Sequence, residues 1–301
     1  MRPTAKVLLF ICLLFVMHTG YYPIQYGFEG YESFSAEELS KLDLNTSEAI
    51  VLTDVKYGES DKQRFDLFLP SGRQEGVTKV LVLLHGGSWV RGDKAGINSL
   101  VATLLDRFPE HAIINMNYSL AGKDNFAFPN QFNDIQKVLD HMTINANRYQ
   151  VQPIFGIVGK SAGGHLGMMF DNAFDKYDQV KFVCSIAGPT NLTDPLYMQN
   201  AAFEKLHTML IDTDVYKERS LKELSPLHTF SKTTSPSLLL YGKKDRKVPV
   251  SNGLDYAKAL DEAAIKNELH LFEGGHIRNW TSKDWQKAYD RLEFFVGQYL
   301  N

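Results

Sequence analysis

A serine bracketed by glycines, directly after a short apolar run, is the feature that most limits how this chain can fold. Residues 159–163 read Gly-Lys-Ser-Ala-Gly, and residues 154–158 before them read Ile-Phe-Gly-Ile-Val. This order predicts a strand, a tight turn and a helix, with the Ser161 hydroxyl presented at the turn. Gly159 and Gly163 meet the need for small residues where strand and helix pass close together.

Two simpler interpretations of this motif compete with a nucleophilic serine. Gly-Lys-Ser also occurs in phosphate-binding loops, but that motif needs a glycine at the position of Ile154, so the spacing excludes it. An ordinary glycine-serine turn is the other alternative. The strand-like run before the motif argues against it, because the nucleophile turn requires a strand there.

A glycine loop follows an earlier apolar run. Residues 79–84 read Lys-Val-Leu-Val-Leu-Leu, which favours a strand buried on both faces. Serine esterases need backbone N–H groups aimed at the oxyanion that forms during acyl transfer. We predict that Gly87, Ser88 and Ala162 supply them. The remaining residues of the loop support the motif, namely His85, Gly86 and Trp89. A glycine turn that only caps the strand is the alternative.

A carboxylate and a histidine follow two further strand-like segments. Asp245 lies in a lysine-rich loop after residues 237–241, and His276 ends a glycine loop after residues 268–272. An open parallel sheet places its site at the carboxyl ends of its strands. We therefore expect His276 to accept the Ser161 proton and Asp245 to orient the imidazole. Asp194 is the main alternative for the acid.

These motifs together resemble α/β-hydrolases of the carboxylesterase type. The chain is similar to the branch that holds bacterial feruloyl and acetyl-xylan esterases and kynurenine formamidases. Further shared motifs are Tyr57-Gly58, residues 65–70 (Phe-Asp-Leu-Phe-Leu-Pro), Gly92-Asp93-Lys94, Asn117-Tyr118, and Phe128-Pro129 before a helix containing Asp134. Two positions depart from the pattern. Ser88 replaces a third glycine, and Lys160 occupies a position that more often holds His, Asp or Glu.

The fold expected is α/β, with a mostly parallel sheet, helices on both faces and a small cap-like insertion. Alternating strand-like and helix-like segments point the same way, and residues 51–301 have a normal length for one such domain. Residues 188–236 would form the cap or a wall of the acyl pocket, with helices near 200–211 and 215–224. Ordinary solvent-side helices are an equal alternative for this stretch.

The first fifty residues differ from the rest. Residues 1–20 combine Arg2 and Lys6 with eleven apolar residues from Val7 to Met17, which predicts a signal peptide or an uncleaved membrane anchor. Residues 21–50 read as a polar lead-in, with a possible short helix at 37–42. We therefore expect an exported protein, periplasmic, secreted or anchored. Once this segment is removed, Cys184 is the single cysteine, so no intrachain disulfide is expected.

The composition argues against two classes of binding partner, nucleic acids and metal ions. The formal net charge is −3, and no basic cluster suggests nucleic acid. No Cys/His cluster has metal-site spacing. The motifs predict a cofactor-free serine carboxylesterase that hydrolyses short-chain acyl esters, and the resemblance implies that these include carbohydrate-linked acetyl or feruloyl esters. Membrane contact is expected only through residues 1–20. An arylformamidase shares the His-Gly-Gly-x-Trp loop and is the nearest alternative; a non-catalytic binding protein on the same fold is a more distant one.

Overall fold

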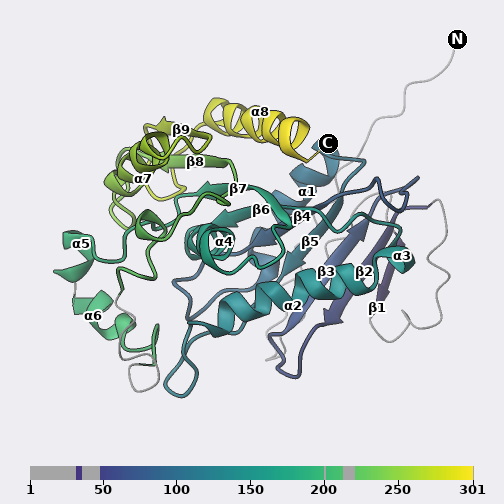
Figure 1. Cartoon of the computed structure of the whole chain (residues 1–301), viewed down its shortest axis with the longest axis horizontal. Coiled ribbons are helices and arrows are strands. Elements are labelled where there is room, and N and C mark those ends of the chain that lie inside the picture. The colour runs from purple at the N-terminus through teal and green to yellow at the C-terminus, as the bar shows by residue number, and fades with distance from the viewer. Residues whose placement is uncertain (1–31, 36–47, 200, 213–220, 301) are drawn as a thin grey trace, which may run out of the picture.

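A parallel sheet forms the centre of the molecule. The computed structural model describes residues 32–35, 48–199, 201–212 and 221–300. Within these residues the sheet has nine strands in the order β1-β2-β3-β5-β4-β6-β7-β8-β9 (Figure 1). Only β3 runs antiparallel to its neighbours. The strands are β1 (Glu32–Ser35), β2 (Ile50–Lys56), β3 (Arg64–Leu69), β4 (Val80–Leu84), β5 (Ala112–Met116), β6 (Phe155–Lys160), β7 (Val180–Ile186), β8 (Ser237–Gly242) and β9 (Asn267–Phe272).

Helices cover both faces of the sheet (Figure 1). On one face lie α2 (Asn130–Ile144), with α3 (Ala146–Tyr149) after it, α4 (Ala162–Ala173) and α7 (Val250–Glu262); on the other lie α1 (Asn98–Arg107), after the short helix η2 (Lys94–Ile97), and α8 (Ser282–Tyr299). Two buried apolar clusters fill the two spaces. Within β6, Phe155 and Ile157 join the first cluster and Val158 joins the second. This alternation is expected for a strand buried on both faces.

The predicted fold class is confirmed. The apolar runs at 79–84, 154–158, 237–241 and 268–272 form β4, β6, β8 and β9. These four strands and β7 run parallel to one another, side by side in the order β4-β6-β7-β8-β9. The loops that follow them therefore meet at one edge of the sheet, which is where the candidate catalytic residues lie.

The described part of the expected cap has less helix than the sequence suggested. Residues 188–236 contain α5 (Pro195–Met198), α6 (Ala201–His207) and η3 (Pro226–His228). The helix predicted for 200–211 ends at His207, because the next residues form turns and pair with the chain before α2. The N–H groups of Ala127 and Phe128 donate to the carbonyls of Met209 and Leu210. Residues 221–224 form a turn, and 213–220, in the second predicted helix, lie outside the described residues.

Most of the N-terminal prediction lies outside the described residues. Residues 1–31 and 36–47 include the expected targeting segment and the short helix at 37–42. Within the lead-in, β1 pairs in parallel with β2 at the sheet edge. In the part of the chain that the structure covers, no helix has the length and apolar character needed to cross a membrane. Cys184 is buried in β7 as a free thiol, and burial raises its pKa.

Candidate active site

Ser161 occupies the tight turn between β6 and α4. Its backbone has φ 55° and ψ −118°, a conformation that costs a non-glycine residue about 1–3 kcal/mol. The surrounding hydrogen bonds hold it there. Its N–H donates to Ile186 O at 2.8 Å, and its carbonyl accepts from the N–H of His165 at 3.1 Å. The predicted strand–turn–helix is therefore present, with Ser161 at its strained point.

The glycines around Ser161 are explained by close packing. A Cβ on Gly159 would collide with the Gly163 carbonyl, and one on Gly163 would collide with the Leu84 carbonyl at the end of β4. The first turn of α4 therefore touches the ends of both β6 and β4. Any larger side chain at either glycine would push the helix, and Ser161 with it, away from the sheet.

Ser161, His276 and Asp245 form one hydrogen-bonded chain. Ser161 Oγ lies 2.9 Å from His276 Nε2, and His276 Nδ1 lies 2.6 Å from Asp245 Oδ2. A carboxylate only accepts hydrogen bonds, so we assign the imidazole proton to Nδ1 and leave Nε2 to accept from the serine. The Asp245 side chain is fully buried, and its other oxygen accepts from the N–H groups of Lys247 and Val248 at 2.7 and 3.0 Å.

Asp194, the alternative acid, has different partners. It begins α5 and accepts from the Leu196 N–H at 2.9 Å. Its other oxygen accepts from Ser251 Oγ and Asn252 Nδ2, both at 3.2 Å. Asp194 therefore joins α5 to the start of α7, whereas Asp245 contacts the imidazole.

The predicted oxyanion loop follows β4 and turns sharply. Gly87, Ser88 and Trp89 all have positive φ, at 142°, 53° and 63°. At Gly87 a Cβ would collide with the Arg91 carbonyl, so glycine is required there. Among the described residues, no acceptor is bonded to the N–H groups of Gly87, Ser88 or Ala162. Such free N–H groups are what a developing oxyanion needs, provided they converge on it.

Trp89 connects this loop to α4. Its indole Nε1 donates to His165 Nδ1 at 3.2 Å, and the opposite His165 nitrogen contacts Leu224 O at 2.8 Å. Burial lowers the pKa of His165 to about 4, so the ring is neutral and its proton is on Nε2. Gln131 Nε2 donates to Trp89 O at 2.8 Å. The sequence analysis did not predict this link between His165 and Trp89.

His85, at the start of the same loop, is also buried. Its ring stacks on Tyr118 with centroids 4.2 Å apart, and the Tyr118 hydroxyl donates to the His85 carbonyl at 2.7 Å. His85 Nδ1 lies 2.8 Å from the Gly86 carbonyl. Burial lowers the pKa of His85. The His85 side chain therefore packs against Tyr118 and the backbone of its own loop.

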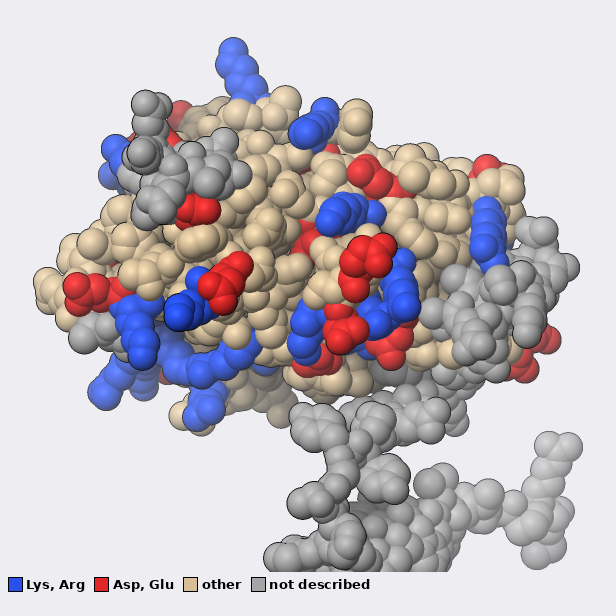
Figure 2. All heavy atoms as spheres, turned by 90° about the horizontal axis from the view of Figure 1, so that it is seen from below, with Lys and Arg blue, Asp and Glu red and all other residues tan. Residues whose placement is uncertain are grey.

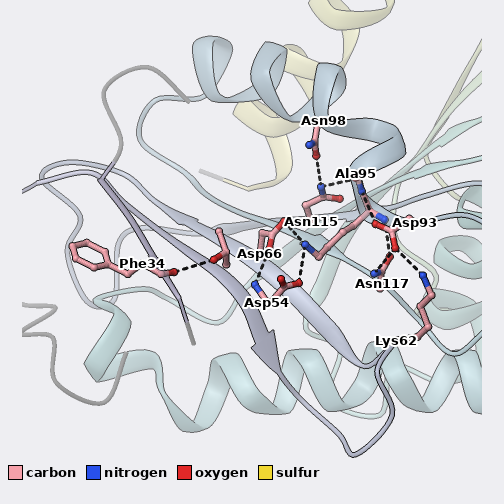
Figure 3. Close-up of polar contacts among 11 residues, drawn as sticks. Phe34, Asp54, Lys62, Asp66, Asp93, Ala95, Asn98, Asn115 and Asn117 are labelled. Carbon is pink, nitrogen blue, oxygen red and sulfur yellow. Dashed lines mark hydrogen bonds and ion pairs between the residues drawn. The ribbon is translucent and has the colours of Figure 1, made fainter. Parts of the chain in front are cut away.

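A polar network fixes the far end of the loop (Figure 3). The Lys94 ammonium lies 2.6 Å from Asp66 Oδ2 on β3 and 3.1 Å from Asp54 Oδ1 on β2. Burial opposes the charge on Lys94, but the attraction of Asp66 and Asp54 outweighs it and raises the pKa of Lys94. The Lys94 N–H also donates to Asn117 Oδ1 at 2.6 Å. The end of the loop is thus bound to β2, to β3 and to the residue after β5.

The neighbouring Asp93 is held more loosely. It accepts from Lys62 Nζ at 2.8 Å and from Asn117 Nδ2 at 3.0 Å, and it caps η2 through the Ala95 N–H (Figure 3). Its ion pair with Lys62 is 40–45% exposed, whereas the Lys94–Asp66 pair is 12–14% exposed. The two lysines therefore hold the same loop through ion pairs of very different burial.

Metal ligation receives no support from the described side chains. No group of three or more His, Cys, Asp or Glu residues among them is arranged to hold a metal ion.

A strained serine at a strand–helix turn, bonded to a histidine and an aspartate at the carboxyl edge of this sheet, defines the α/β-hydrolase class. The chain belongs to the BD-FAE family, a carboxylesterase family of this class, which it matches over residues 65–260. It is 25% identical over 241 residues to acylamino-acid-releasing enzyme 1 of Oryza sativa subsp. japonica, covering 72% of this chain and 29% of that protein.

Two further likenesses fit this family. The chain is 25% identical over 234 residues to the probable carboxylic ester hydrolase LipM of Mycobacterium tuberculosis (strain ATCC 25618 / H37Rv), covering 70% of this chain and 52% of that protein. It thus spans only about a third to a half of these two curated relatives. A truncated carbohydrate esterase from gut microbiota shares the fold, with a TM-score of 0.70 and 20% identity over 83% of this chain and 96% of that one.

Proposed function

We propose that this protein is a serine carboxylesterase that removes short acyl groups from carbohydrate esters. The observation that carries the proposal is the unbroken chain from Ser161 Oγ through His276 to Asp245, at 2.9 and 2.6 Å. Membership of a carboxylesterase family supports the reaction, and the name of the gut-microbiota carbohydrate esterase supports the substrate class.

The reaction proposed has two halves. Ser161 Oγ attacks the ester carbonyl carbon as His276 Nε2 takes its proton, and the carbonyl oxygen becomes an oxyanion near the N–H groups of Gly87, Ser88 and Ala162. The C–O bond then breaks, and His276 returns the proton to the leaving alcohol oxygen. Water attacks the acyl-enzyme in the same manner, which releases the acid and restores the serine. Asp245 holds the imidazole in place throughout and stabilises its charged form.

The preference for short acyl groups rests on the cap-like segment. Its described part contains several charged side chains: Glu204, Lys205, Asp212, Lys222 and Glu223. Burying a methylene in an apolar pocket contributes about 0.8 kcal/mol. A segment this polar is poorly suited to line a deep acyl tunnel. We also propose that the protein is exported or membrane-anchored, as residues 1–20 suggest.

The test combines a variant with a substrate series. Ser161→Ala should lower kcat by roughly 10³-fold or more, as removal of a triad nucleophile does. Ser99→Ala, which changes an exposed serine on α1, is the matched control and should keep wild-type activity. Wild-type kcat/KM on p-nitrophenyl esters should be greatest from acetate to butyrate. Full activity in the Ser161 variant would disprove the mechanism, and a maximum at decanoate or longer would disprove the acyl preference.

A further inference from the structure

Exposed cationic residues neighbour the histidine and the acid of the candidate triad in the sequence. We use the term basic rim for four exposed residues: Lys244, Arg246, Lys247 and Arg278. Two of them flank Asp245 directly, and Arg278 is two residues after His276. None of the four has an ion-pair partner among the residues described. The basic rim can therefore form ion pairs with a molecule that binds to this protein.

The basic rim comes from two loops that are held against each other. The Lys244 N–H donates to the Gly274 carbonyl at 3.0 Å, and the Gly275 N–H donates to the Arg278 carbonyl at 2.9 Å. The Lys247 N–H donates to Asp245 Oδ1. The backbones that carry these cations are thus fixed by the same contacts that position Asp245 and His276. The basic rim is therefore carried by the same two loops that carry Asp245 and His276.

The charge lies on one side of the nucleophile. The loops 243–249 and 273–281 contain five cationic and two acidic side chains, while the loops 85–93 and 117–129, after β4 and β5, contain two of each. Of the two acids, Asp245 is buried against His276 and Glu273 pairs with Lys243. The whole chain carries a formal net charge of −3. Figure 2 shows lysine and arginine side chains gathered at the lower left of the face seen from below, at the end of the molecule where α5, α6 and α7 lie in Figure 1.

Lys160 adds a further cation beside the nucleophile itself. It directly precedes Ser161 and is half-buried, and its ammonium has no hydrogen-bond or ion-pair partner among the described residues. Strand alternation places its side chain on the same sheet face as Val158, facing the cluster that Ile277 also packs against. Burial lowers the pKa of Lys160. Lys160 and the His276 loop therefore lie on one side of the sheet.

The proposed mechanism determines which part of the substrate meets this charge. The leaving alcohol oxygen must come within hydrogen-bond reach of His276 Nε2, because that nitrogen returns the proton to it. The carbonyl oxygen points instead toward Gly87, Ser88 and Ala162. The alcohol half of the ester thus extends over the His276 side of the site, next to the basic rim.

We propose that the natural alcohol is an acidic saccharide, whose uronic-acid carboxylates pair with the basic rim. This inference rests on the proposed esterase function and names its substrate class. Carboxylates spaced along a sugar chain suit a row of separate cations better than one deep pocket would. In water, a unit charge about 7 Å from a carboxylate favours binding roughly threefold, so two such pairs together give about tenfold.

The experiment compares two acetylated oligosaccharides on the full chain. One is an acetylated oligogalacturonide and the other an acetylated xylo-oligosaccharide of matched length and acetyl content, with released acetate as the measurement. We expect kcat/KM to be about tenfold higher on the acidic substrate at 0.01 M salt. The ratio should shrink toward one at 1 M salt, because the Debye length falls from about 30 to 3 Å.

Charge-removing variants locate the effect. The triple change Arg246→Gln, Lys247→Gln and Arg278→Gln should reduce the acidic-to-neutral ratio to near one. Lys176→Gln removes an exposed cation between α4 and β7, at the amino ends of the parallel strands and so away from the candidate triad. This control should leave the ratio unchanged. Because the ratio is measured within each variant, a general loss of folded protein cancels from it.

Three outcomes would overturn the inference. A wild-type ratio near one at low salt, or a ratio that survives the triple change, would remove the role of the rim. Rim-dependent binding to anionic phospholipid vesicles with no effect on the ratio would assign the charge to a membrane surface instead. Failure of the esterase proposal looks different, since p-nitrophenyl acetate and both oligosaccharides would then remain intact.

Discussion

Two buried aspartates follow neighbouring strands, and their hydrogen bonds separate their roles. Asp245 follows β8 and bonds to His276, whereas Asp194 follows β7 and bonds to residues at the start of α7. The sequence favoured Asp245 but left Asp194 as an alternative, because either loop emerges at the same edge of the sheet. The distinction depends on which carboxylate reaches the imidazole, a property of the assembled structure.

Amide substitutions test this assignment at both positions. Asp245→Asn should lower kcat by roughly 10³–10⁴-fold, because the imidazole loses both its orienting charge and its preferred tautomer. Asp194→Asn should leave kcat within a few-fold and lower the free energy of unfolding by about 1–2 kcal/mol, since it weakens the junction of α5 with α7. Steady-state kinetics and urea unfolding of both variants provide the measurements. Greater catalytic damage from the Asp194 variant would reassign the acid.

The triad residues were predictable because each lies in a local sequence motif. The contacts that support them join residues far apart in the sequence and were not predictable. Ser161 and the glycines around it follow from a five-residue pattern, and Asp245 and His276 from the ends of strand-like runs. His165 was visible only as a residue of the helix after the nucleophile. Its partners Trp89 and Leu224 are 76 and 59 residues away, so no spacing rule could reveal the connection.

Among the structural elements, the loop after β4 is held at two points. Trp89 binds His165 of α4, and the Asp93–Lys94 end is bound to β2, β3 and residues after β5 (Figure 3). The loop thus keeps Gly87, Ser88 and Trp89 in their positive-φ conformations without regular structure of its own. The sequence predicted the loop, but its restraint depends on strands that precede and follow it.

Two lysines in this network differ in burial and therefore in expected energetic effect. Lys94→Met should lower the free energy of unfolding by about 3–5 kcal/mol, because it leaves the buried Asp66 without its cation. Lys62→Met removes the exposed partner of Asp93 and should cost less than about 1 kcal/mol. Urea unfolding at neutral pH compares the two. Equal losses would show that burial of the Lys94 pair has no energetic consequence.

Across the elements, the buried parallel strands were the most predictable part of the fold. Continuous apolar runs mark β4, β6 and β8 because both faces of each strand are covered. The cap-like segment was less predictable. Its helix at 200–211 stops early because Met209 and Leu210 bond to Ala127 and Phe128, a tertiary contact that local helix preference does not include.

At the scale of the whole molecule, two buried groups make opposite contributions to pH-dependent stability. Burial raises the pKa of Asp171 to about 7 and lowers that of His165 to about 4. The folded state therefore binds the Asp171 proton more tightly than the unfolded state, and stability falls as pH rises from about 4 to 7. The His165 contribution has the other sign, with stability lost as pH falls from about 6.5 to 4. Between about pH 4 and 6.5 the two groups therefore change the free energy of unfolding in opposite directions.

Asp171→Asn should expose the His165 contribution alone. The variant should be more stable than the wild type at pH 8 by a few kcal/mol, at about 1.4 kcal/mol for each unit of pKa shift, and the difference should vanish near pH 4. Urea unfolding at pH 4, 6 and 8 gives the three values. Asp106→Asn, at an exposed position on α1, is the control and should follow the wild type. Parallel curves for wild type and Asp171→Asn would contradict the prediction.

The separation of the triad along the chain also has a consequence for biosynthesis. His276 meets Ser161 across 115 residues, and the loop that carries it follows β9, at one edge of the described sheet. A nascent chain that has already formed its nucleophile turn still lacks its base until β9 has been translated and docked beside β8. A ribosome-bound intermediate with a complete oxyanion loop would thus be inert. Onset of ester cleavage during translation would report the docking of that last strand.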